Sequence, residues 1–288
     1  MSPTPHSYPS FRGVLADHPL VRIAGAHSAL GGVIAEQVGF QAVWASSFEI
    51  SAARCLPDAS LLSMSEYLDA AAHIQKALSV PVVADCDTGF GNSMNVAYMV
   101  AEYEQAGITA VCMEDKIFPK MNSFAAADHS LLDVNAFAHK IETAKKSQRS
   151  EDFFVIARTE AMISGLGVDE ALKRCAVYAD AGADAVLVHS KQATKDEVLS
   201  FLDQWDDRLP VVVVPTTYPD WHADEARAAG VSAVIYANQG LRATITSLRS
   251  ALGSIYETGH SAHLEDSIAG VKDVFALQRL DQWQEFTA

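Results

Sequence analysis

One short pattern occurs four times along the chain and limits its fold more than any other feature. In each copy a glycine is followed three positions later by Ala-Val, and the copies begin at Gly39, Gly107, Gly182 and Gly230. An amphipathic segment rich in Ala and Glu precedes every copy, so each glycine fits the position just after the end of a helix. The residues that follow are apolar and often β-branched, which is typical of a strand buried on both faces. The pattern therefore predicts a helix, a glycine stop and a buried strand.

Further strand candidates lie between these copies, so strands and helices are expected to alternate. About eight strands in 288 residues leave 288/8 = 36 residues for each strand and its helix, which is ample for a βα unit. Two sequences, Ser63-Met-Ser-Glu66 and Thr194-Lys-Asp-Glu197, have the form of a capping box before an apolar-periodic run. The additional strands are expected at residues 21–26, 80–85, 153–158 and 210–214.

Equal βα units with buried parallel strands predict an α/β fold, a (β/α)8 barrel of the TIM type. A doubly wound open sheet is the alternative, but no G-x-G-x-x-G follows the first strand. No linker divides the chain, so we expect one barrel domain over residues 1–288 that begins with a flexible leader at residues 1–18. Helices expected at residues 242–257 and 264–286 extend past the last strand, and residues 259–288 would form a C-terminal helical extension. The second of these helices exceeds what barrel closure requires, which favours a role between subunits.

The charge balance argues against several classes of partner. Lys and Arg number 21 and Asp and Glu number 36, which gives a net charge of −15. Nucleic acids and anionic membranes bind basic surfaces, so we expect neither as a partner.

No apolar run reaches the length of about 18 residues that a membrane-spanning helix needs, and the start, MSPTPHSYPSF, lacks the apolar region of a signal peptide. The four scattered cysteines favour reduced thiols and a cytoplasmic location.

Three acidic residues lie at the ends of neighbouring predicted strands, where barrels of this type carry their chemistry. Asp85 and Asp87 are two residues apart and would share one strand face, and Glu114 ends the next strand. Converging carboxylates repel one another unless a cation neutralises them, and oxygen ligands favour Mg²⁺ or Mn²⁺ over Zn²⁺. We therefore predict a divalent metal site, with solvated loop acids or helix caps as the alternative. Cys86 would face the other way and is expected to be a packed thiol.

Two basic residues end the next predicted strands. Arg158 at a strand end favours a bidentate oxyanion such as a phosphate or a carboxylate. The alternative is a structural ion pair with Glu160, which shares its strand face. His189 could contact the same anion or could be a satisfied core histidine. Together with the acids, these residues predict a site for a small phosphorylated or carboxylated substrate.

A long connection without periodicity, residues 115–132, follows Glu114 and is expected to be a lid. It offers donors that would close over an anionic substrate. A second polar loop carries Asp58, which the composition leaves open as a turn residue or a catalytic one. The lid donors are Lys116, Lys120, Asn122 and Ser123.

These residues lie in motifs that resemble one family. The motifs are WASSFEISAA with LPDAS, DCDTGFGN, EDKIFPKMNS, IARTEAMISG, VLVHSK and VVPTTY, and the resemblance extends from Val21 to the C-terminal VKDVFALQ segment. The chain resembles the phosphoenolpyruvate mutase and phosphonopyruvate hydrolase branch of the isocitrate lyase superfamily. This resemblance implies a Mg²⁺-dependent (β/α)8 barrel whose last helix is swapped between partners in a dimer of dimers.

The resemblance also implies a role for each matching residue. Asp85, Asp87 and Glu114 would hold Mg²⁺ directly or through waters. Asp58 would be an essential aspartate near the migrating phosphorus, and Lys120 a lid lysine. The other implied roles are binding of the substrate carboxylate and carbonyl by Ser46 and the amides of Ser47 and Phe48 beside Trp44, and binding of the phosphoryl group by Arg158, His189 and Asn122.

For the activity, the resemblance implies either a mutase that interconverts phosphoenolpyruvate and phosphonopyruvate or a hydrolase that converts phosphonopyruvate to pyruvate and phosphate. The lid pattern E-D-K-x5-N-S matches the mutase, whereas LPDAS resembles the hydrolase at least as well, and Ser47 replaces a commoner glycine. We favour the mutase, an isomerase, because Asn122 would exclude water from the phosphoryl group.

Three other classes of protein fit the sequence less well. The superfamily's carbon–carbon lyases carry a lid cysteine, and the lid here has none. A Schiff-base aldolase would leave the three carboxylates unexplained. A non-catalytic binding protein should have lost some of the acids or bases, all of which are present.

Overall fold

The computed structural model describes residue 8 and residues 10–287, whereas residues 1–7, 9 and 288 lie outside the described part. Contacts within the chain divide it into two compact units, residues 1–238 and residues 239–288. The strands named below all belong to the first unit, and the second is helical. The C-terminal helical extension expected at residues 259–288 lies within the second unit.

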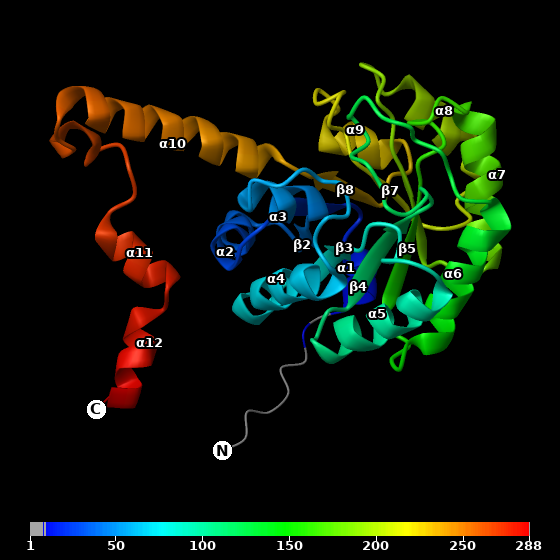
Figure 1. Ribbon diagram of the computed structural model, residues 1–288, viewed down its shortest axis with the longest axis horizontal. Coiled ribbons are helices and arrows are strands. Elements are labelled where there is room, and N and C mark those ends of the chain that lie inside the picture. The colour runs from blue at the N-terminus through cyan, green and yellow to red at the C-terminus, as the bar shows by residue number, and fades with distance from the viewer. Residues whose placement is uncertain (1–7, 9, 288) are drawn as a thin grey trace. The chain divides into compact units, whose positions relative to one another are not determined.

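The first unit is a closed barrel of eight parallel strands in sequence order, in which β8 pairs with β1 (Figure 1). Helices alternate with the strands, so the predicted (β/α)8 fold is confirmed. The strands are β1 Val21–Ala26, β2 Ala42–Ala45, β3 Val82–Asp85, β4 Ala110–Glu114, β5 Phe154–Thr159, β6 Ala185–Val188, β7 Val211–Val213 and β8 Ala233–Tyr236. The helices are α1 Phe11–Asp17, α2 Ala29–Val38, α3 Ser47–Ala53, α4 Met64–Ala77, α5 Ser93–Gln105, α6 Val134–Ser147, α7 Gly167–Asp180, α8 Asp196–Trp205 and α9 Ala223–Ala228.

The glycine repeat marks the points where a helix gives way to a strand, as the sequence predicted. Each glycine lies three residues before a strand: β2, β4, β6 or β8. Their φ angles are positive, a conformation in which a side chain is strained. The angles are +105° at Gly39, +87° at Gly107, +94° at Gly182 and +93° at Gly230.

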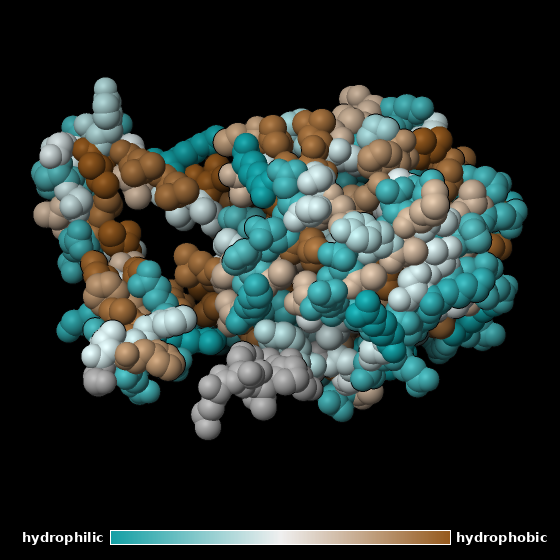
Figure 2. Space-filling model, turned by 60° about the horizontal axis from the view of Figure 1, so that its bottom comes forward, coloured by the Kyte–Doolittle hydropathy of each residue, from teal (hydrophilic) through white to brown (hydrophobic). Residues whose placement is uncertain are grey.

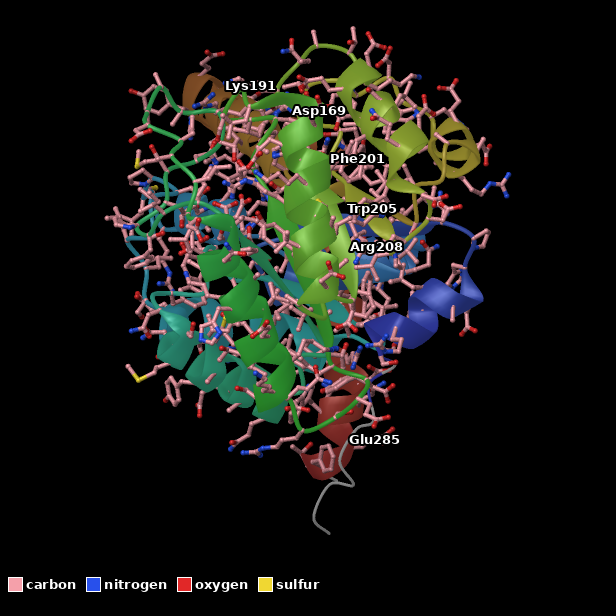
Figure 3. All side chains as sticks on the ribbon, turned by 90° about the vertical axis from the view of Figure 1, so that its right-hand side faces the viewer. Asp169, Lys191, Phe201, Trp205, Arg208 and Glu285 are labelled. Atoms are coloured by element: carbon pink, nitrogen blue, oxygen red, sulfur yellow. The ribbon has the colours of Figure 1, made fainter. Side chains whose placement is uncertain are left out.

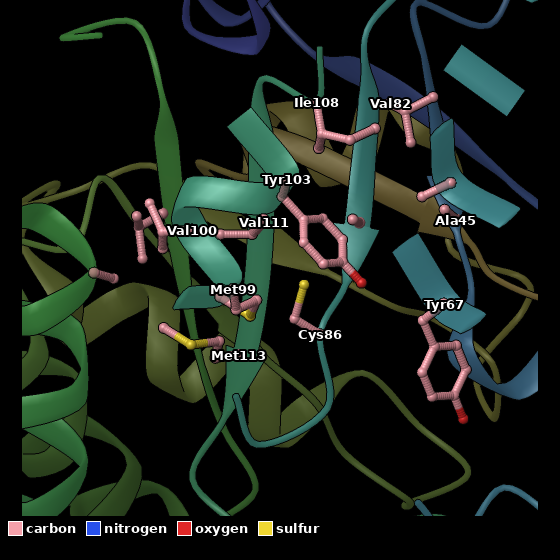
Figure 4. Packing of buried hydrophobic residues seen from close by; sticks show 14 of the residues in the cluster. Ala45, Tyr67, Val82, Cys86, Met99, Val100, Tyr103, Ile108, Val111 and Met113 are labelled. Atoms are coloured by element: carbon pink, nitrogen blue, oxygen red, sulfur yellow. The ribbon is translucent and has the colours of Figure 1, made fainter. Parts of the chain in front are cut away.

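The strand side chains alternate between two hydrophobic layers, as expected for strands buried on both faces. One layer fills the barrel interior and includes Val21 and Trp44. The other packs between the strands and the surrounding helices. Cys86 belongs to this outer layer, beside Tyr103 and Met113 (Figure 4), and burial raises the pKa of its thiol. Cys86 is therefore a packed thiol, as predicted.

The N-terminal segment departs from the sequence prediction. The predicted leader, residues 1–18, is partly outside the described residues, but Phe11–Asp17 forms α1, capped by the side chain of Ser10. Phe11 is fully buried and its ring meets that of Phe154 edge to face, with centroids 5.3 Å apart. The helix forms because Phe11 inserts into the hydrophobic cluster of the barrel interior.

Two helix predictions were wrong. Thr194 does not cap α8, because Lys195 precedes the helix without a side-chain cap and Glu197 instead accepts a hydrogen bond from Ser190. The helix expected at residues 264–286 is broken into shorter pieces, since Gly270 precedes α11 and Arg279 has a φ of +53°. The second unit therefore consists of α10 Gln239–Thr258, η1 Ala262–Leu264, α11 Val271–Leu277, α12 Leu280–Gln284 and η2 Glu285–Thr287.

Hydrophobic side chains are exposed on the second unit, where brown atoms are visible in Figure 2. On α10 they recur every three or four residues, a spacing that places them on one helix face. Among the described residues no helix is both long enough and apolar enough to cross a membrane. The exposed side chains on α10 are Ile245, Leu248, Leu252 and Tyr256.

Candidate active site

Polar side chains gather where the strands end and the following loops begin. β3 ends at Asp85 and β4 at Glu114, and Glu114 is the direct neighbour of Arg158 in the register of β4 and β5. Figure 3 shows this end of the barrel, with Lys191, which follows β6, and Asp169 in the first turn of α7. This is the end at which barrels of this type carry their active sites.

The connection between β4 and α6 contains no helix, as predicted for a lid. Its two arms meet at an isolated bridge between Lys116 and Leu131. Farther along, the backbone amide of Asn122 donates to the carbonyl oxygen of Asp58 at 3.0 Å. The lid therefore lies on the loop that carries Asp58.

The carboxylate of Asp58 is enclosed by lid residues. The Nζ of Lys120 lies 2.8 Å from Oδ1, and the side-chain amide of Asn122 donates to Oδ2 at 2.8 Å. Asp58 and Lys120 are both buried. The Lys120 Nζ also lies 3.2 Å from Oδ1 of Asp87 and donates to Oγ of Ser47 at 3.3 Å. One lid ammonium thus connects two loops that follow different strands.

Burial and charge oppose one another in this cluster. Burial raises the pKa of Asp58, but the Lys120 ammonium and the hydrogen bonds from Lys120 and Asn122 outweigh it, so the pKa lies below its usual value. Burial lowers the pKa of Lys120, and the surrounding carboxylates, Asp87 first, raise it well above its usual value. The pKa of Asp87 lies above its usual value, because burial and the nearby charge of Asp85 raise it more than the Lys120 ammonium lowers it. Lys120 is therefore charged at neutral pH.

Ser47 and Ser60 hold the acids of β3 and its loop in place. The Ser47 hydroxyl donates to Oδ2 of Asp85 at 2.8 Å, and the Ser47 amide donates to the same oxygen at 3.2 Å. The Ser60 hydroxyl donates to Oδ2 of Asp87 at 3.1 Å. Asp87 adopts a φ of +48°, so the direction of its side chain is determined by a tight turn and not by strand geometry.

A second cluster forms around Glu160, which is fully buried. The guanidinium of Arg158 lies 2.6 Å from Oε1 of Glu160, and the Lys116 Nζ lies 3.1 Å from Oε2. The lid residue Ser123 donates to the same Oε2 at 2.5 Å. Arg158 also lies 3.3 Å from Glu114. The ion pair between Arg158 and Glu160, the structural alternative in the sequence, is therefore present.

His189 completes this second cluster. Its Nδ1 lies 3.1 Å from Nη2 of Arg158, and its ring is 5.4 Å from that of the lid residue Phe124. The Nε2 atom is buried and has no hydrogen-bond partner among the described residues. Burial lowers the pKa of His189, and Arg158 lowers it further while Glu160 opposes both. His189 is therefore the neutral imidazole at neutral pH.

The three predicted metal ligands do not converge as a ligand set here, and no group of three His, Cys, Asp or Glu side chains in the described chain does. Asp85 is held by the Ser47 hydroxyl, Asp87 lies against the Lys120 ammonium, and Glu114 lies against the Arg158 guanidinium, so these cations offset part of the negative charge of the acids. Burial raises the pKa of Glu114 to about 7, against the opposing charges of Arg158 and Lys116.

The donor set nevertheless fits a divalent cation. Oδ1 of Asp87 and Oε1 of Glu114 are buried and accept no hydrogen bond from the described residues. All candidate ligands are carboxylate oxygens, which suits Mg²⁺. The formal charge of the two clusters is 3 − 5 = −2, from the cations Lys116, Lys120 and Arg158 and the acids Asp58, Asp85, Asp87, Glu114 and Glu160.

The residues predicted to bind the carboxylate and carbonyl of the substrate lie mostly outside the two clusters. Trp44 is buried in the barrel interior, and Phe48 is partly exposed on α3. The Ser46 hydroxyl caps α3 by accepting from the amide of Glu49 at 3.2 Å. The described contacts do not bring Trp44 or Phe48 into either cluster.

Two residues of the site, Asp115 and Ser60, were not assigned by the sequence, and the contacts of a third, Glu160, with the lid were not predicted. Asp115 is buried and accepts from Thr159, from Tyr178 and from the amide of Glu160, so it anchors the start of the lid. Ser60, in the predicted Asp58 loop, holds Asp87. Glu160 joins the lid to Arg158. Its spacing, two residues after Arg158 on one strand face, identified it in the sequence as a partner of Arg158 but gave no sign of its contacts with the lid.

Comparison with known proteins identifies the family of this chain. The family described as phosphoenolpyruvate phosphomutase matches residues 11–256. A phosphonopyruvate hydrolase from Variovorax sp. (strain Pal2) is 42% identical, over 93% of each chain. The crystal structure of a phosphoenolpyruvate phosphomutase from Streptomyces platensis subsp. rosaceus is similar with a TM-score of 0.94 and 50% identity, covering 95% of this chain and 96% of that one.

A second solved structure, a phosphonopyruvate hydrolase in complex with oxalate and Mg²⁺, has a TM-score of 0.90 and 40% identity, over 95% of each chain. Both enzymes of the predicted branch are thus represented among its relatives. The chain belongs to the phosphoenolpyruvate phosphomutase family.

Proposed function

We propose that this protein is a phosphoenolpyruvate mutase, an isomerase that interconverts phosphoenolpyruvate and phosphonopyruvate. The observation that carries the proposal is the enclosure of the Asp58 carboxylate by Lys120 and Asn122 of the lid. In the forward direction the bond between phosphorus and the enol oxygen breaks, and a bond between phosphorus and the methylene carbon forms. No water enters the balance, so a lid that excludes water suits this reaction.

The residues of the two clusters would position the substrate and stabilise the charge of the transition state, and these are the main contributions of a protein to phosphoryl transfer. Arg158, His189 and Asn122 are proposed to bind the phosphoryl group. Ser123, which accepts a hydrogen bond from Arg158, is proposed to assist them. Asp58 would lie next to the phosphorus as it moves. The carboxylate and carbonyl of the substrate would be bound at the start of α3, by Ser46, Ser47 and Phe48 beside Trp44.

Asp85, Asp87 and Glu114 are proposed to hold Mg²⁺. Oδ1 of Asp87 and Oε1 of Glu114 are buried and accept no hydrogen bond from the described residues, and the two clusters have a formal charge of −2; both observations support the proposal, as does the relative solved with oxalate and Mg²⁺. When bound, the ion would neutralise negative charge on the substrate oxygens. Mn²⁺ has the same preference for oxygen ligands and is expected to substitute.

A second candidate is phosphonopyruvate hydrolase, which is favoured by the 42% identity to the Variovorax enzyme. This reaction consumes water and releases pyruvate and phosphate. It requires a path for water to the phosphorus, which the buried contacts of Asn122 and Lys120 with Asp58 oppose.

We also propose that the enzyme is a homo-oligomer, a dimer of dimers with its last helix swapped between partners. The exposed apolar face of α10 supports this, as does a second exposed stripe on α2 at Leu30, Ile34 and Val38. Light scattering coupled to gel filtration measures the assembly directly, and a monomer would contradict the proposal. The proposed location is the cytoplasm, on the sequence argument given above.

A phosphorus NMR time course with phosphonopyruvate and Mg²⁺ tests the proposed activity. We expect a phosphoenolpyruvate signal to grow as the phosphonate signal decays. Inorganic phosphate that appears together with pyruvate, without phosphoenolpyruvate, would establish the hydrolase instead. An unchanged spectrum would contradict both activities.

A further inference from the structure

Glu160 has two carboxylate oxygens that face different partners. Oε1 lies 2.6 Å from the Arg158 guanidinium, on the barrel side. Oε2 accepts from Ser123 at 2.5 Å and lies 3.1 Å from the Lys116 Nζ, both of which belong to the lid segment. The amide of Glu160 is itself fixed, because it donates to Oδ1 of Asp115 at 2.8 Å. Glu160 is therefore a bridge between the lid and Arg158.

Arg158 in turn determines which nitrogen of His189 carries the proton. A guanidinium only donates hydrogen bonds, so the contact of 3.1 Å between Nη2 and Nδ1 requires Nδ1 of His189 to be the acceptor. Oε1 of Glu160 lies 3.6 Å from the same Nδ1, which is beyond hydrogen-bond distance. The proton of the neutral ring is therefore on Nε2.

The Nε2 atom is the part of His189 that is left for a ligand. It is buried, and no atom of the described residues bonds to it. A protonated Nε2 is a hydrogen-bond donor, which suits a phosphoryl oxygen, whereas a bare Nε2 would repel it. The opposite tautomer would also place Nδ1–H against the Arg158 donor.

We propose that Glu160 is a positioning residue, which holds Arg158 against Nδ1 of His189 and so keeps Nε2 of His189 as a donor to the phosphoryl group when the lid is closed. The identity of that ligand rests on the proposed function. Glu160 acts through Arg158 and His189 and does not itself contact the substrate.

The test uses the full-length enzyme labelled with ¹⁵N-histidine, and the His189 signals are assigned by their loss in His189→Asn. In the substrate-free wild type we expect Nδ1 to be unprotonated and Nε2 to be protonated. In Glu160→Gln we expect a mixture of tautomers, because the carboxylate that holds Arg158 is gone. A wild type with the proton on Nδ1, or an unchanged spectrum in Glu160→Gln, would overturn the proposal. The wild-type measurement stands even if the variant does not fold.

Kinetics provide the second measurement. We expect Glu160→Gln to lower kcat by at least about tenfold with a smaller change in KM, because the donor at Nε2 acts most on the charge of the transition state. Glu160→Asp keeps the charge and should recover part of the rate. Equal rates in Gln and Asp variants would contradict a role for the carboxylate.

Asp184→Asn is the matched control. Asp184 is also held by two cations, Arg12 and Lys145, each at 2.7 Å, and it accepts from the amide of Val155. We expect this variant to lose a comparable amount of stability while its kinetics and its His189 signals stay unchanged. Because the tautomer is measured without turnover, a protein that fails the phosphorus NMR test can still pass or fail this one.

Discussion

The carboxylate of Asp58 lies 2.8 Å from the Nζ of Lys120, and both side chains are buried. The two residues are 62 positions apart and belong to different loops. Loss of one partner of a buried ion pair destabilises the folded protein, because the other charge stays buried without a counter-charge. The pair therefore couples the position of the lid to the charge at Asp58.

The first prediction concerns Asp58 itself. We expect Asp58→Ala to keep the fold at reduced stability, since Asp87 still faces Lys120, and to abolish turnover, with kcat lower by at least about 100-fold, because the charge proposed to lie beside the phosphorus is removed. Asp58→Asn should fold and fail in the same way, since it keeps the shape and loses the charge. Rates are measured by phosphorus NMR, and Asp220→Asn, at an exposed position, is the control. Near wild-type rates in Asp58→Ala would remove Asp58 from the mechanism.

The second prediction concerns water at the phosphoryl group. Asn122→Ala removes the amide that bonds to Asp58, and we expect kcat/KM to fall by at least about tenfold, or roughly 1.4 kcal/mol. The share of turnovers that release inorganic phosphate should rise, because the lid no longer excludes water. Ser130→Ala, which affects only an exposed lid contact with Asp128, should change neither quantity. Unchanged kinetics in Asn122→Ala would show that the lid assignment is wrong.

The third prediction concerns the proposed metal site. A ligand that binds only the folded state at about 100 times its Kd stabilises it by about 2.7 kcal/mol. We expect Mg²⁺ to raise the Tm of the wild type and EDTA to reverse the effect. Asp85→Asn should reduce this shift, whereas Asp69→Asn on the exposed face of α4 should keep it. An equal Mg²⁺ shift in Asp85→Asn and wild type would remove Asp85 from the metal site.

Much of the fold follows from the sequence because the glycine repeat indicates where each helix ends and the next buried strand begins. Gly107 ends a helix and β4 begins three residues later, and nothing distant is needed to determine this. The helix that contains Phe11 was missed because it is only seven residues long and follows a segment with several prolines. It is held by contacts of Phe11 with residues of distant strands, such as Phe154. The capping role of Thr194 failed for a similar reason, since Ser190 takes the Glu197 carboxylate.

The sequence also predicts one part of the candidate site and not the other. The positions of Asp85, Glu114 and Arg158 follow from the repeat, because these residues lie at strand ends. The lid residues that contact the site acids cannot be predicted from the repeat. The sequence cannot indicate that Lys120 reaches Asp58 and Asp87, because the path of the lid depends on contacts across the barrel mouth.

The fourth prediction concerns Gly25 in β1, which lies opposite Trp44 on β2. A Cβ at this position would lie 2.2 Å from both the carbonyl oxygen of Ala237 and Oε1 of Glu49. Since a backbone oxygen cannot move away cheaply, we expect Gly25→Ala to lower the free energy of unfolding by about 1–3 kcal/mol. Gly253→Ala, at a helical position with nothing within 4 Å, should be neutral or stabilising. Denaturant unfolding measures both, and equal stabilities would contradict the close approach.

The fifth prediction concerns pH and Glu49, which is buried on α3 with its Oε1 lacking a hydrogen-bond partner in the described chain. Burial raises its pKa above the ordinary value of 4.5, and His27, whose Nδ1 lies 3.2 Å from Oε2, partly offsets this. A raised pKa means that the folded state binds the proton more tightly than the unfolded state. The associated stability is therefore present below pH 4.5 and is lost as the pH rises through the pKa of the folded protein.

Glu49→Gln replaces the carboxyl group with a neutral side chain of the same shape, so it should not lose stability in this range. We expect the free energy of unfolding of the wild type, relative to that of Glu49→Gln, to fall steadily as the pH rises above 4.5. Urea unfolding at a series of pH values measures the difference, and Glu151→Gln, at an exposed position, corrects for the loss of one acid. A difference that is constant or grows in favour of the wild type would mean that Glu49 is ionised in the folded protein at no cost.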